Sequence, residues 1–354
     1  MFLRNHWYVA GWGDDIGRVP LDRVLLGESV CLFRKEDGTP IALENRCPHR
    51  NLPLSEGKLI GDVVQCAYHG LEFAPDGICV HVPGQSDVPA WARVKSYPIV
   101  ERDRWLFIWM GDPAKADHDT IPDFHASMSD PAWDVVTGQA HVTAGYRLVL
   151  DNLLDLSHLA YVHTSSTGSS QVAEKADLTT KVHGNIVEIT RWMENIPPAK
   201  AFIEYAGYRD AEHMDRWQFS RFIPPAYIFI CNGSARAGTG ASPADCGTSL
   251  GQWGYQIFHA ATPETETTTH QFWAEAHPRE HIAPDTLEGF QDAMRNIIAE
   301  DLDIYVGQQS AIDLDPEALN RDANPRGTLT ADAALLEMRK VIRRLYGEEL
   351  KLAS

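Results

Sequence analysis

The sequence of 354 residues lacks the features that mark membrane, secreted and nucleic-acid-binding proteins. No apolar run approaches the ~18 residues of a membrane-spanning helix, and the first residues contain no basic segment followed by an apolar run and a cleavage site. Basic residues number 31 against 49 acidic ones, so the surface would repel a nucleic-acid backbone. We therefore expect a cytoplasmic protein that binds neither membranes nor nucleic acids.

Cysteine is also scarce. Six cysteines in 354 residues are too few for a disulfide scaffold, so each is better interpreted on its own. Two of them belong to the first motif described below. We expect the other four to be small buried side chains: Cys31, Cys79, Cys231 and Cys246.

The hydrophobic pattern changes along the chain and predicts two domains, 1–115 and 116–354. The first has short apolar runs separated by turn signals such as Glu36-Asp37-Gly38, which predicts an all-β domain, and residues 112–122 are typical of a linker. In the second we expect helices at 150–162, 285–312 and 331–346, and strands at 182–193, 216–222, 227–231, 252–261 and 267–275. Residues 233–249 form a small-residue loop, a candidate lid or disordered segment. The predicted fold is α+β, with an antiparallel sheet in the second domain.

Two short segments of the first domain each carry one cysteine and one histidine. Cys47 and His49 are followed by Cys66 and His69, in the pattern C-x-H-x16-C-x2-H. Zinc accepts two cysteines and two histidines, but zinc fingers pair cysteine with cysteine and histidine with histidine. One of each per segment is typical of a [2Fe–2S] cluster with cysteines on one iron and histidines on the other. We predict such a cluster on these four residues, with zinc as the alternative.

A second set of metal-ligand residues lies in the predicted helix 150–162 and just beyond it. Asp155 and His158 are three residues apart and share a helix face. His158 and His163 are five apart, about 140° around an ideal helix, so they converge only if the helix distorts or ends between them. Two histidines and a carboxylate form the facial triad of non-haem Fe(II) oxygenases, although zinc takes the same residue types.

The carboxylate has two candidates, Asp155 and Asp301. Asp301 falls on the apolar stripe of the predicted helix 285–312, whereas Asp303 falls on the opposite, solvent-facing side. That stripe consists of Leu287, Phe290, Met294, Ile297, Ile298 and Tyr305. An acid directed into a core needs a cation, and an iron held by the two histidines would provide one. Asp301 is therefore the better candidate.

Both motifs, in this order, resemble those of the α subunits of Rieske non-haem iron oxygenases, and more narrowly those of vanillate O-demethylase oxygenase subunits. The D-x2-H-x4-H string from Asp155 matches the iron motif of that family, and Glu300-Asp301-Leu302 matches its late carboxylate. Further similar segments are residues 5–10, 47–50, 68–71, 146–148, 151–153, 161–163, 193–196 and 262–264. Respiratory Rieske proteins have a disulfide-forming cysteine in each loop. Leu52 and Tyr68 occupy those positions here.

The resemblance implies a Rieske domain followed by a helix-grip (START-like) catalytic domain, with one [2Fe–2S] cluster and one mononuclear Fe(II). It implies that His158, His163 and Asp301 ligate the iron. It also implies a head-to-tail homotrimer, in which Asp155 joins a Rieske histidine of one subunit to His158 of the next. Asp155 would then have a catalytic role without ligating the metal.

The reaction that the resemblance implies is O-demethylation of a methoxylated aromatic acid by O2, with release of formaldehyde. Electrons would come from NADH through a separate flavin/[2Fe–2S] reductase. Ring hydroxylation or dihydroxylation of another aromatic acid is the alternative, and an electron carrier or sensor with a ligand-binding module is a third hypothesis. Candidate pocket residues are Arg191, Arg221, Asn232 and His259, with the aromatic residues Trp192, Phe219, Phe222, Trp253 and Phe258. A structural role is the simpler interpretation of each.

Overall fold

The computed structural model describes residues 2–164, 170–209, 212–282, 286–315 and 329–353. The chain forms two compact units, which are Met1–Pro122 with Thr262–Glu266, and Asp123–Ala261 with Thr267–Ser354. The sequence-based domains 1–115 and 116–354 remain a prediction. Among the described helices, none is both long and apolar enough to cross a membrane.

The first unit is built from three small antiparallel sheets, which confirms the all-β prediction. The first sheet has the order β1 (Trp7–Trp12), β10 (Trp105–Trp109), β9 (Ile99–Arg102), and the second is β2 (Leu21–Leu25), β3 (Glu28–Arg34), β4 (Pro40–Glu44). The third contains β5 (Lys58–Ile60), β6 (Val63–Gln65), β7 (Glu72–Phe73) and β8 (Cys79–His81). Gly38 has a φ of 86° in the turn between β3 and β4, a conformation that glycine adopts without strain.

A short segment from late in the sequence completes this unit. The backbone N–H of Leu26 donates to Pro263 O at 2.8 Å, and that of Gly27 donates to Glu264 O at 2.8 Å. The hydroxyl of Thr262 donates to Val9 O at 2.7 Å. Residues 262–266 therefore contribute hydrogen bonds to a unit whose other residues all come from the first third of the chain.

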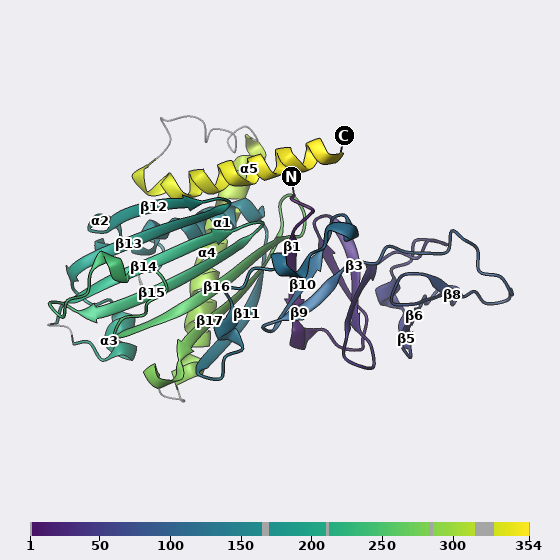
Figure 1. The fold of residues 1–354 in the computed structure, drawn as a ribbon, viewed down its shortest axis with the longest axis horizontal. Helices are drawn as coiled ribbons and strands as arrows, with labels where there is room; N and C mark the ends of the chain where they lie inside the picture. Colours follow the sequence, from purple (N-terminus) through teal and green to yellow (C-terminus); the bar gives the residue numbers. More distant parts are fainter. Residues whose placement is uncertain (1, 165–169, 210–211, 283–285, 316–328, 354) are drawn as a thin grey trace. The chain divides into compact units, whose positions relative to one another are not determined.

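The second unit is an antiparallel sheet of seven strands, with helix α4 lying across it (Figure 1). The strand order is β11 (Trp133–Val142), β17 (Thr269–Pro278), β16 (Trp253–Pro263), β15 (Tyr227–Arg236), β14 (Met214–Ile223), β13 (Ile186–Ile196), β12 (Asp177–His183). The helices are α1 (Tyr146–Leu154), α2 (Ser170–Glu174), α3 (Lys200–Ala206), α4 (Leu287–Leu314) and α5 (Ala333–Ala353). The predicted α+β fold with an antiparallel sheet is confirmed.

Two predicted elements are interrupted in the structure. The expected strand 182–193 is the end of β12 and most of β13, joined by a tight turn in which Gly184 has a φ of 63°. The expected helix 150–162 ends as an α-helix at Leu154 and continues as the 3-10 helix η6 (Leu156–Ala160). Both predictions followed a continuous apolar pattern, which does not show where the backbone turns.

The small-residue loop is neither disordered nor a lid. Residues 237–251 pack on Trp217, whose Nε1 donates to Ser249 O at 2.9 Å. Trp217 and Gln218 are neighbours on β14 and therefore point to opposite faces of the sheet. Because Gln218 faces the cavity described below, the loop covers the other face. Gly233 makes this packing possible, since a Cβ there would lie 2.3 Å from the Trp217 ring.

Candidate metal centres and cavity

The two cysteine loops of the first unit have the same backbone hydrogen bonds. In each, the cysteine N–H donates to the carbonyl of the residue five positions later, at 2.9 Å from Cys47 to Leu52 and 2.8 Å from Cys66 to Leu71. The residue four positions later donates its N–H back to the cysteine carbonyl, at 2.9 Å from Asn51 and 3.0 Å from Gly70. Those two residues have φ values of 62° and 74°. The matching loops present their cysteines and histidines as two equivalent pairs.

The two cysteines and two histidines of these loops lie close together, with the sulfur atoms buried in the unit and the imidazoles at its surface. Cys47 and Cys66 are buried, whereas His49 and His69 are exposed. The two imidazole rings are 4.5 Å apart between centroids, at 64°. Burial, together with the neighbouring Cys66, raises the pKa of Cys47 to about 11. The Cys47 thiol is therefore held protonated unless a metal replaces the proton. Two sulfur and two nitrogen donors fit a Rieske cluster.

The end of α1 brings the two histidines of the second centre together. Asp155 is both the C-cap residue of α1 and the N-cap residue of η6, and its carboxylate accepts a hydrogen bond from Ser157 N at 2.9 Å. The tighter 3-10 turn that follows changes the direction of the chain. His158 and His163 consequently lie with their ring centroids 5.2 Å apart. The α-helix ends at Leu154, before both histidines, and this break in the helix allows their side chains to converge.

Asp301 of α4 completes this centre. Its Oδ1 lies 3.7 Å from His158 Nε2 and 3.2 Å from His163 Nε2, and the three candidate ligand atoms are all within 4.8 Å of one another. Asn152 donates to the same oxygen at 3.2 Å. Asp301 is 3% exposed, whereas Asp303 is exposed, as the helical pattern predicted. Two imidazoles and one carboxylate arranged in this way fit a mononuclear iron.

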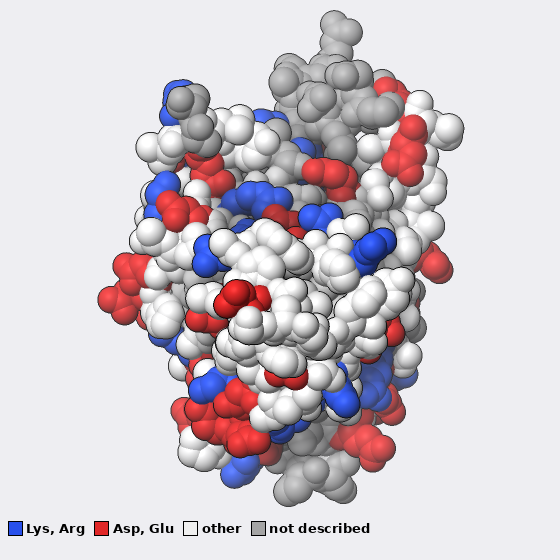
Figure 2. Space-filling view, turned by 90° about the vertical axis from the view of Figure 1, so that its right-hand side faces the viewer, with Lys and Arg blue, Asp and Glu red and all other residues white. Residues whose placement is uncertain are grey.

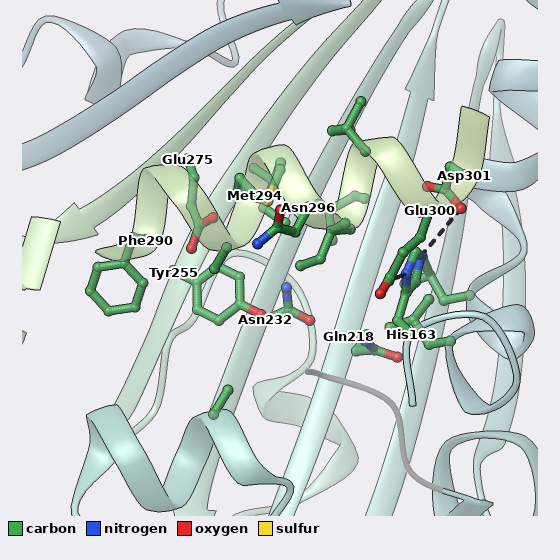
Figure 3. Close-up of a pocket in the computed structure, with 18 of the residues that line it drawn as sticks. His163, Gln218, Asn232, Tyr255, Glu275, Phe290, Met294, Asn296, Glu300 and Asp301 are labelled. Carbon is green, nitrogen blue, oxygen red and sulfur yellow. Dashed lines mark hydrogen bonds and ion pairs between the residues drawn. The ribbon is translucent and has the colours of Figure 1, made fainter. Parts of the chain in front are cut away.

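The ring orientations are set by hydrogen bonds from the other nitrogen of each histidine. His158 Nδ1 donates to Asp155 O at 2.5 Å, and His163 Nδ1 donates to Glu300 Oε2 at 2.6 Å (Figure 3). Each Nε2 thereby keeps a lone pair that faces Asp301 and could ligate a metal ion. Glu300 is part of the late-carboxylate string, but no role was predicted for it.

The surroundings shift the pKa values of the two histidines in opposite directions. Burial lowers the pKa of His158. Burial also acts to lower the pKa of His163, but hydrogen bonds to Asp301 and Glu300 outweigh it and raise that pKa above its ordinary value. A metal ion bound between Nε2 and Asp301 would supply the positive charge in place of a proton.

Asp155 lies beside the centre without joining its three ligand atoms. Its side chain is 23% exposed and approaches Arg191 at 3.8 Å. Arg191 is buried, and burial lowers its pKa to about 10, with Asp155 opposing the shift. The partly exposed carboxylate can contact groups outside the chain. Its role as a bridge between subunits remains a prediction.

A cavity of about 290 Å³ extends from the iron centre between the sheet and α4 (Figure 3). Its apolar and aromatic lining includes Leu153, Leu156, Leu159, Tyr205, Ile230, Trp253, Tyr255, Ile257, Phe290, Met294 and Ile298. Its polar lining includes Asn152, Gln218, Asn232, His259, Glu275 and Asn296. A largely apolar cavity with a few polar groups is typical of a small-molecule site.

The sequence-based pocket candidates divide between the cavity and other places. Asn232, His259 and Trp253 line the cavity. Arg191 pairs with Asp155, and Arg221 donates to Glu188 at 2.8 Å. The other four aromatic candidates lie outside the lining: Trp192, Phe219, Phe222 and Phe258. Burial lowers the pKa of His259 to about 4, so this side chain presents a neutral imidazole to the cavity.

Several lining residues were missed, among them Gln218, Tyr255, Glu275 and Asn296. Gln218, Tyr255 and Glu275 lie on β14, β16 and β17, and the residues next to them on each strand are buried or partly buried. A signal was present, because a buried strand with polar residues at every second position indicates a functional face. The register Gln218, Asn232, Tyr255 across β14, β15 and β16 makes that face visible only once the strands are paired.

Comparisons with known proteins agree with both centres. The Rieske [2Fe–2S] domain model matches residues 6–98, and the vanillate O-demethylase oxygenase C-terminal domain model matches residues 142–348. The toluene-4-sulfonate monooxygenase iron-sulfur subunit of Comamonas testosteroni is 37% identical over 353 residues, covering 99% of this chain and 98% of that protein. The vanillate O-demethylase oxygenase subunit of a Pseudomonas species is 35% identical over 357 residues, covering 100% and 97%.

Solved structures show the same fold. Dicamba monooxygenase bound to 3,6-dichlorosalicylic acid has a TM-score of 0.87 at 30% identity, covering 100% of this chain and 99% of that one. A structure of that enzyme with non-haem iron and dicamba has a TM-score of 0.81. The chain has a Rieske [2Fe–2S] domain and a non-haem iron site, and it is the oxygenase component of a monooxygenase. It belongs to the Rieske non-haem iron oxygenases, in the family of the vanillate O-demethylase oxygenase subunits.

Proposed function

We propose that the chain O-demethylates a methoxylated aromatic acid in the cytoplasm, forming a phenol and formaldehyde. The observation that carries this proposal is one continuous cavity that reaches from the iron ligands to a wall of aromatic side chains. Vanillate and dicamba O-demethylase components among the relatives support the same reaction type. The overall change consumes O2, two electrons and two protons, and yields one water besides the two products.

The side chains of this chain would hold the metals and position the substrate. Cys47, His49, Cys66 and His69 would hold the cluster, and His158, His163 and Asp301 the iron. When bound, the cluster delivers single electrons and the ferrous ion activates dioxygen. The apolar lining would hold the aromatic ring and keep bulk water away from the iron centre. Asn152 would keep Asp301 in its ligating orientation through their 3.2 Å hydrogen bond.

We propose that electrons come from an NADH-dependent flavin/[2Fe–2S] reductase and that the chain forms a homotrimer. The surface around the exposed histidines of the first unit supports protein docking. Tyr68 is 60% exposed with its ring 3.9 Å from that of His69, and Trp91 is 55% exposed with its ring 6.5 Å from that of His49. Figure 2 views the side at which β5–β8 lie in Figure 1, and the middle of this surface carries few charges. Exposed apolar surface of this kind marks interaction sites.

The reaction is tested by oxygen uptake with NADH and a reductase, over a panel of methoxybenzoates and other aromatic acids. We expect one formaldehyde per O2 consumed with the methoxylated acids. Oxygen consumption that yields hydroxylated rings or diols without formaldehyde would instead indicate ring hydroxylation. No uptake with any reductase would favour an electron carrier or sensor.

The proposed route between subunits passes through His69 and Asp155. In Asp155→Asn we expect product formation to be lost while both metals stay bound and the cluster is still reduced, because the ligand atoms are unchanged. Iron content, cluster absorbance and formaldehyde are measured on the same preparation. Normal turnover would remove Asp155 from the route.

A further inference from the structure

The cavity has two ends of different chemistry. Figure 3 shows His163, Glu300 and Asp301 at one end, and Tyr255, Glu275 and Phe290 at the other, which we call the distal end. Asp301 follows Phe290 by eleven positions on α4, which corresponds to about 16 Å along a helix. Two acids of the lining are buried, Asp301 and Glu275, at 3% and 5% exposure. The iron accounts for Asp301, whereas the proposed reaction leaves Glu275 without a role.

Glu275 is fixed by one hydrogen bond. His277 Nε2 donates to Glu275 Oε1 at 2.7 Å. The His277 ring is fully buried and stacks on Phe290 at 4.1 Å and on Tyr255 at 5.3 Å between centroids. Its Nδ1 has no hydrogen-bond partner within the part of the chain that the structure describes, so a proton there would be buried and unpaired. The tautomer with hydrogen on Nε2 alone satisfies this geometry and leaves Glu275 with its negative charge.

Among the described residues that line the cavity, none is a buried Lys or Arg that could neutralise Glu275. The buried Arg216 does not line the cavity, and its guanidinium lies over the ring of Phe202 at 4.7 Å. Lys200 lines the cavity, but it is exposed at the start of α3. Burial, and then the negative charge of Glu275, raises the pKa of Tyr255 against the opposing charge of Arg216, so this hydroxyl stays protonated and neutral. A buried carboxylate held by a single neutral donor favours a positive partner.

Other cavity groups also present acceptor atoms. Gln218 Oε1 and Asn232 Oδ1 are buried without a hydrogen-bond partner among the described residues, and both side chains line the cavity. At the distal end the walls are aromatic: Tyr205 and Phe290 lie 4.5 Å apart between ring centroids, and Trp253 lies 5.7 Å from Tyr255. Aromatic faces around a carboxylate bind cations better than anions, because the faces also carry partial negative charge.

We propose that the distal end binds a cationic nitrogen of the substrate, with Glu275 accepting its N–H and Tyr205, Tyr255 and Phe290 surrounding it. This inference rests on the proposed demethylation and specifies its substrate class. The substrate is then a methoxylated aromatic acid that also carries a protonated amine, with the amine remote from the reacting methyl group. A carboxylate on the same molecule lies away from this end, because Glu275 would repel it.

Binding of three matched probes to the holoenzyme without reductase tests this assignment, because no turnover occurs under these conditions. The probes are 2-(3-methoxyphenyl)ethylamine, 2-(3-methoxyphenyl)ethanol and 3-(3-methoxyphenyl)propanoate, with affinities measured by calorimetry. We expect the amine to bind about 10- to 100-fold more tightly than the alcohol, as for a hydrogen bond to a charged group, and the acid to bind most weakly. Equal affinities, or tightest binding of the acid, would overturn the proposal even if no variant folds.

Variants then assign the preference to one residue. Glu275→Gln keeps the size and one acceptor but removes the charge, so the amine should bind within about threefold of the alcohol. Asp303→Asn removes the same charge from the exposed side of α4 and should keep the wild-type preference. An unchanged preference in Glu275→Gln would contradict the assignment.

Formaldehyde release is measured separately with the same amine after reductase is added. Amine binding that depends on Glu275, with no formaldehyde from the amine or from the methoxylated acids, would refute the demethylation and leave the cation site standing. Formaldehyde from acids, with no effect of Glu275→Gln on amine binding, would support the demethylation and refute the cation site.

Discussion

The two metal centres are built in opposite ways. The candidate cluster ligands all lie between Cys47 and His69, on two loops with the same hydrogen bonds. The candidate iron ligands come from η6 and the residues just after it, and from α4, which lie far apart in the sequence. The first centre therefore depends on local turn geometry, and the second depends on how a helix is held across a sheet. This difference predicts how each centre responds to substitution.

The strongest test of independence removes a cluster ligand. Cys66→Ser replaces a thiolate with a poor iron ligand, so we expect loss of the cluster absorbance and of all turnover. Mononuclear iron should remain at one per chain, because its candidate ligands belong to the other unit. Iron content and visible absorbance of the purified variant measure both outcomes. Loss of both metals would show that the centres are coupled in folding.

The reciprocal change is Asp301→Ala. We expect the mononuclear iron to be absent and the cluster chromophore to be kept, with no product formed, because one of three ligand atoms is removed. Asp303→Ala is the matched control, since that carboxylate is exposed on the same helix and should have no effect. Retention of mononuclear iron in Asp301→Ala would move the ligand to another carboxylate.

A smaller effect is expected from Glu300, which orients His163 from outside the ligand set. Glu300→Gln removes the charge that accepts from Nδ1, and the iron affinity should fall about 10- to 100-fold. Competition with a chelator measures the affinity, and cluster absorbance serves as the internal control. Wild-type affinity in both Glu300→Gln and Glu300→Ala would show that the 2.6 Å contact has no part in holding the iron.

The last expected effect is on the pH dependence of stability, with no direct effect on either metal centre. Burial lowers the pKa of His259 to about 4, below its ordinary value of 6.5. Between these values the unfolded chain binds a proton that the folded chain does not, so stability is lost as the pH falls. The loss attributable to His259 is about 3 kcal/mol between pH 7 and pH 4. Urea unfolding of His259→Asn should show a shallower pH dependence than wild type, and an equal slope would contradict the assignment.

The same contrast explains what could be predicted from the sequence. The cluster motif was readable because all four residues are local, and Asp301 was readable because a helix repeats its inward face every three or four residues. Glu275 and Gln218 were not, since both faces of their strands are buried and only strand pairing shows which face meets the cavity. The end of α1 at Leu154 was also missed, because the apolar pattern continues into η6.

The hairpin tip Thr262–Glu266 has a consequence for dissecting the protein. A fragment that ends at Pro122 would leave the amides of Leu26 and Gly27 without their acceptors and Val9 O without the Thr262 hydroxyl. Its cysteine loops would be intact, but the turn between β2 and β3 and the strand β1 would lose their hydrogen bonds to residues 262–264. An isolated electron-carrying module therefore needs this pentapeptide added back, for example by fusion through a linker, because simple truncation removes it.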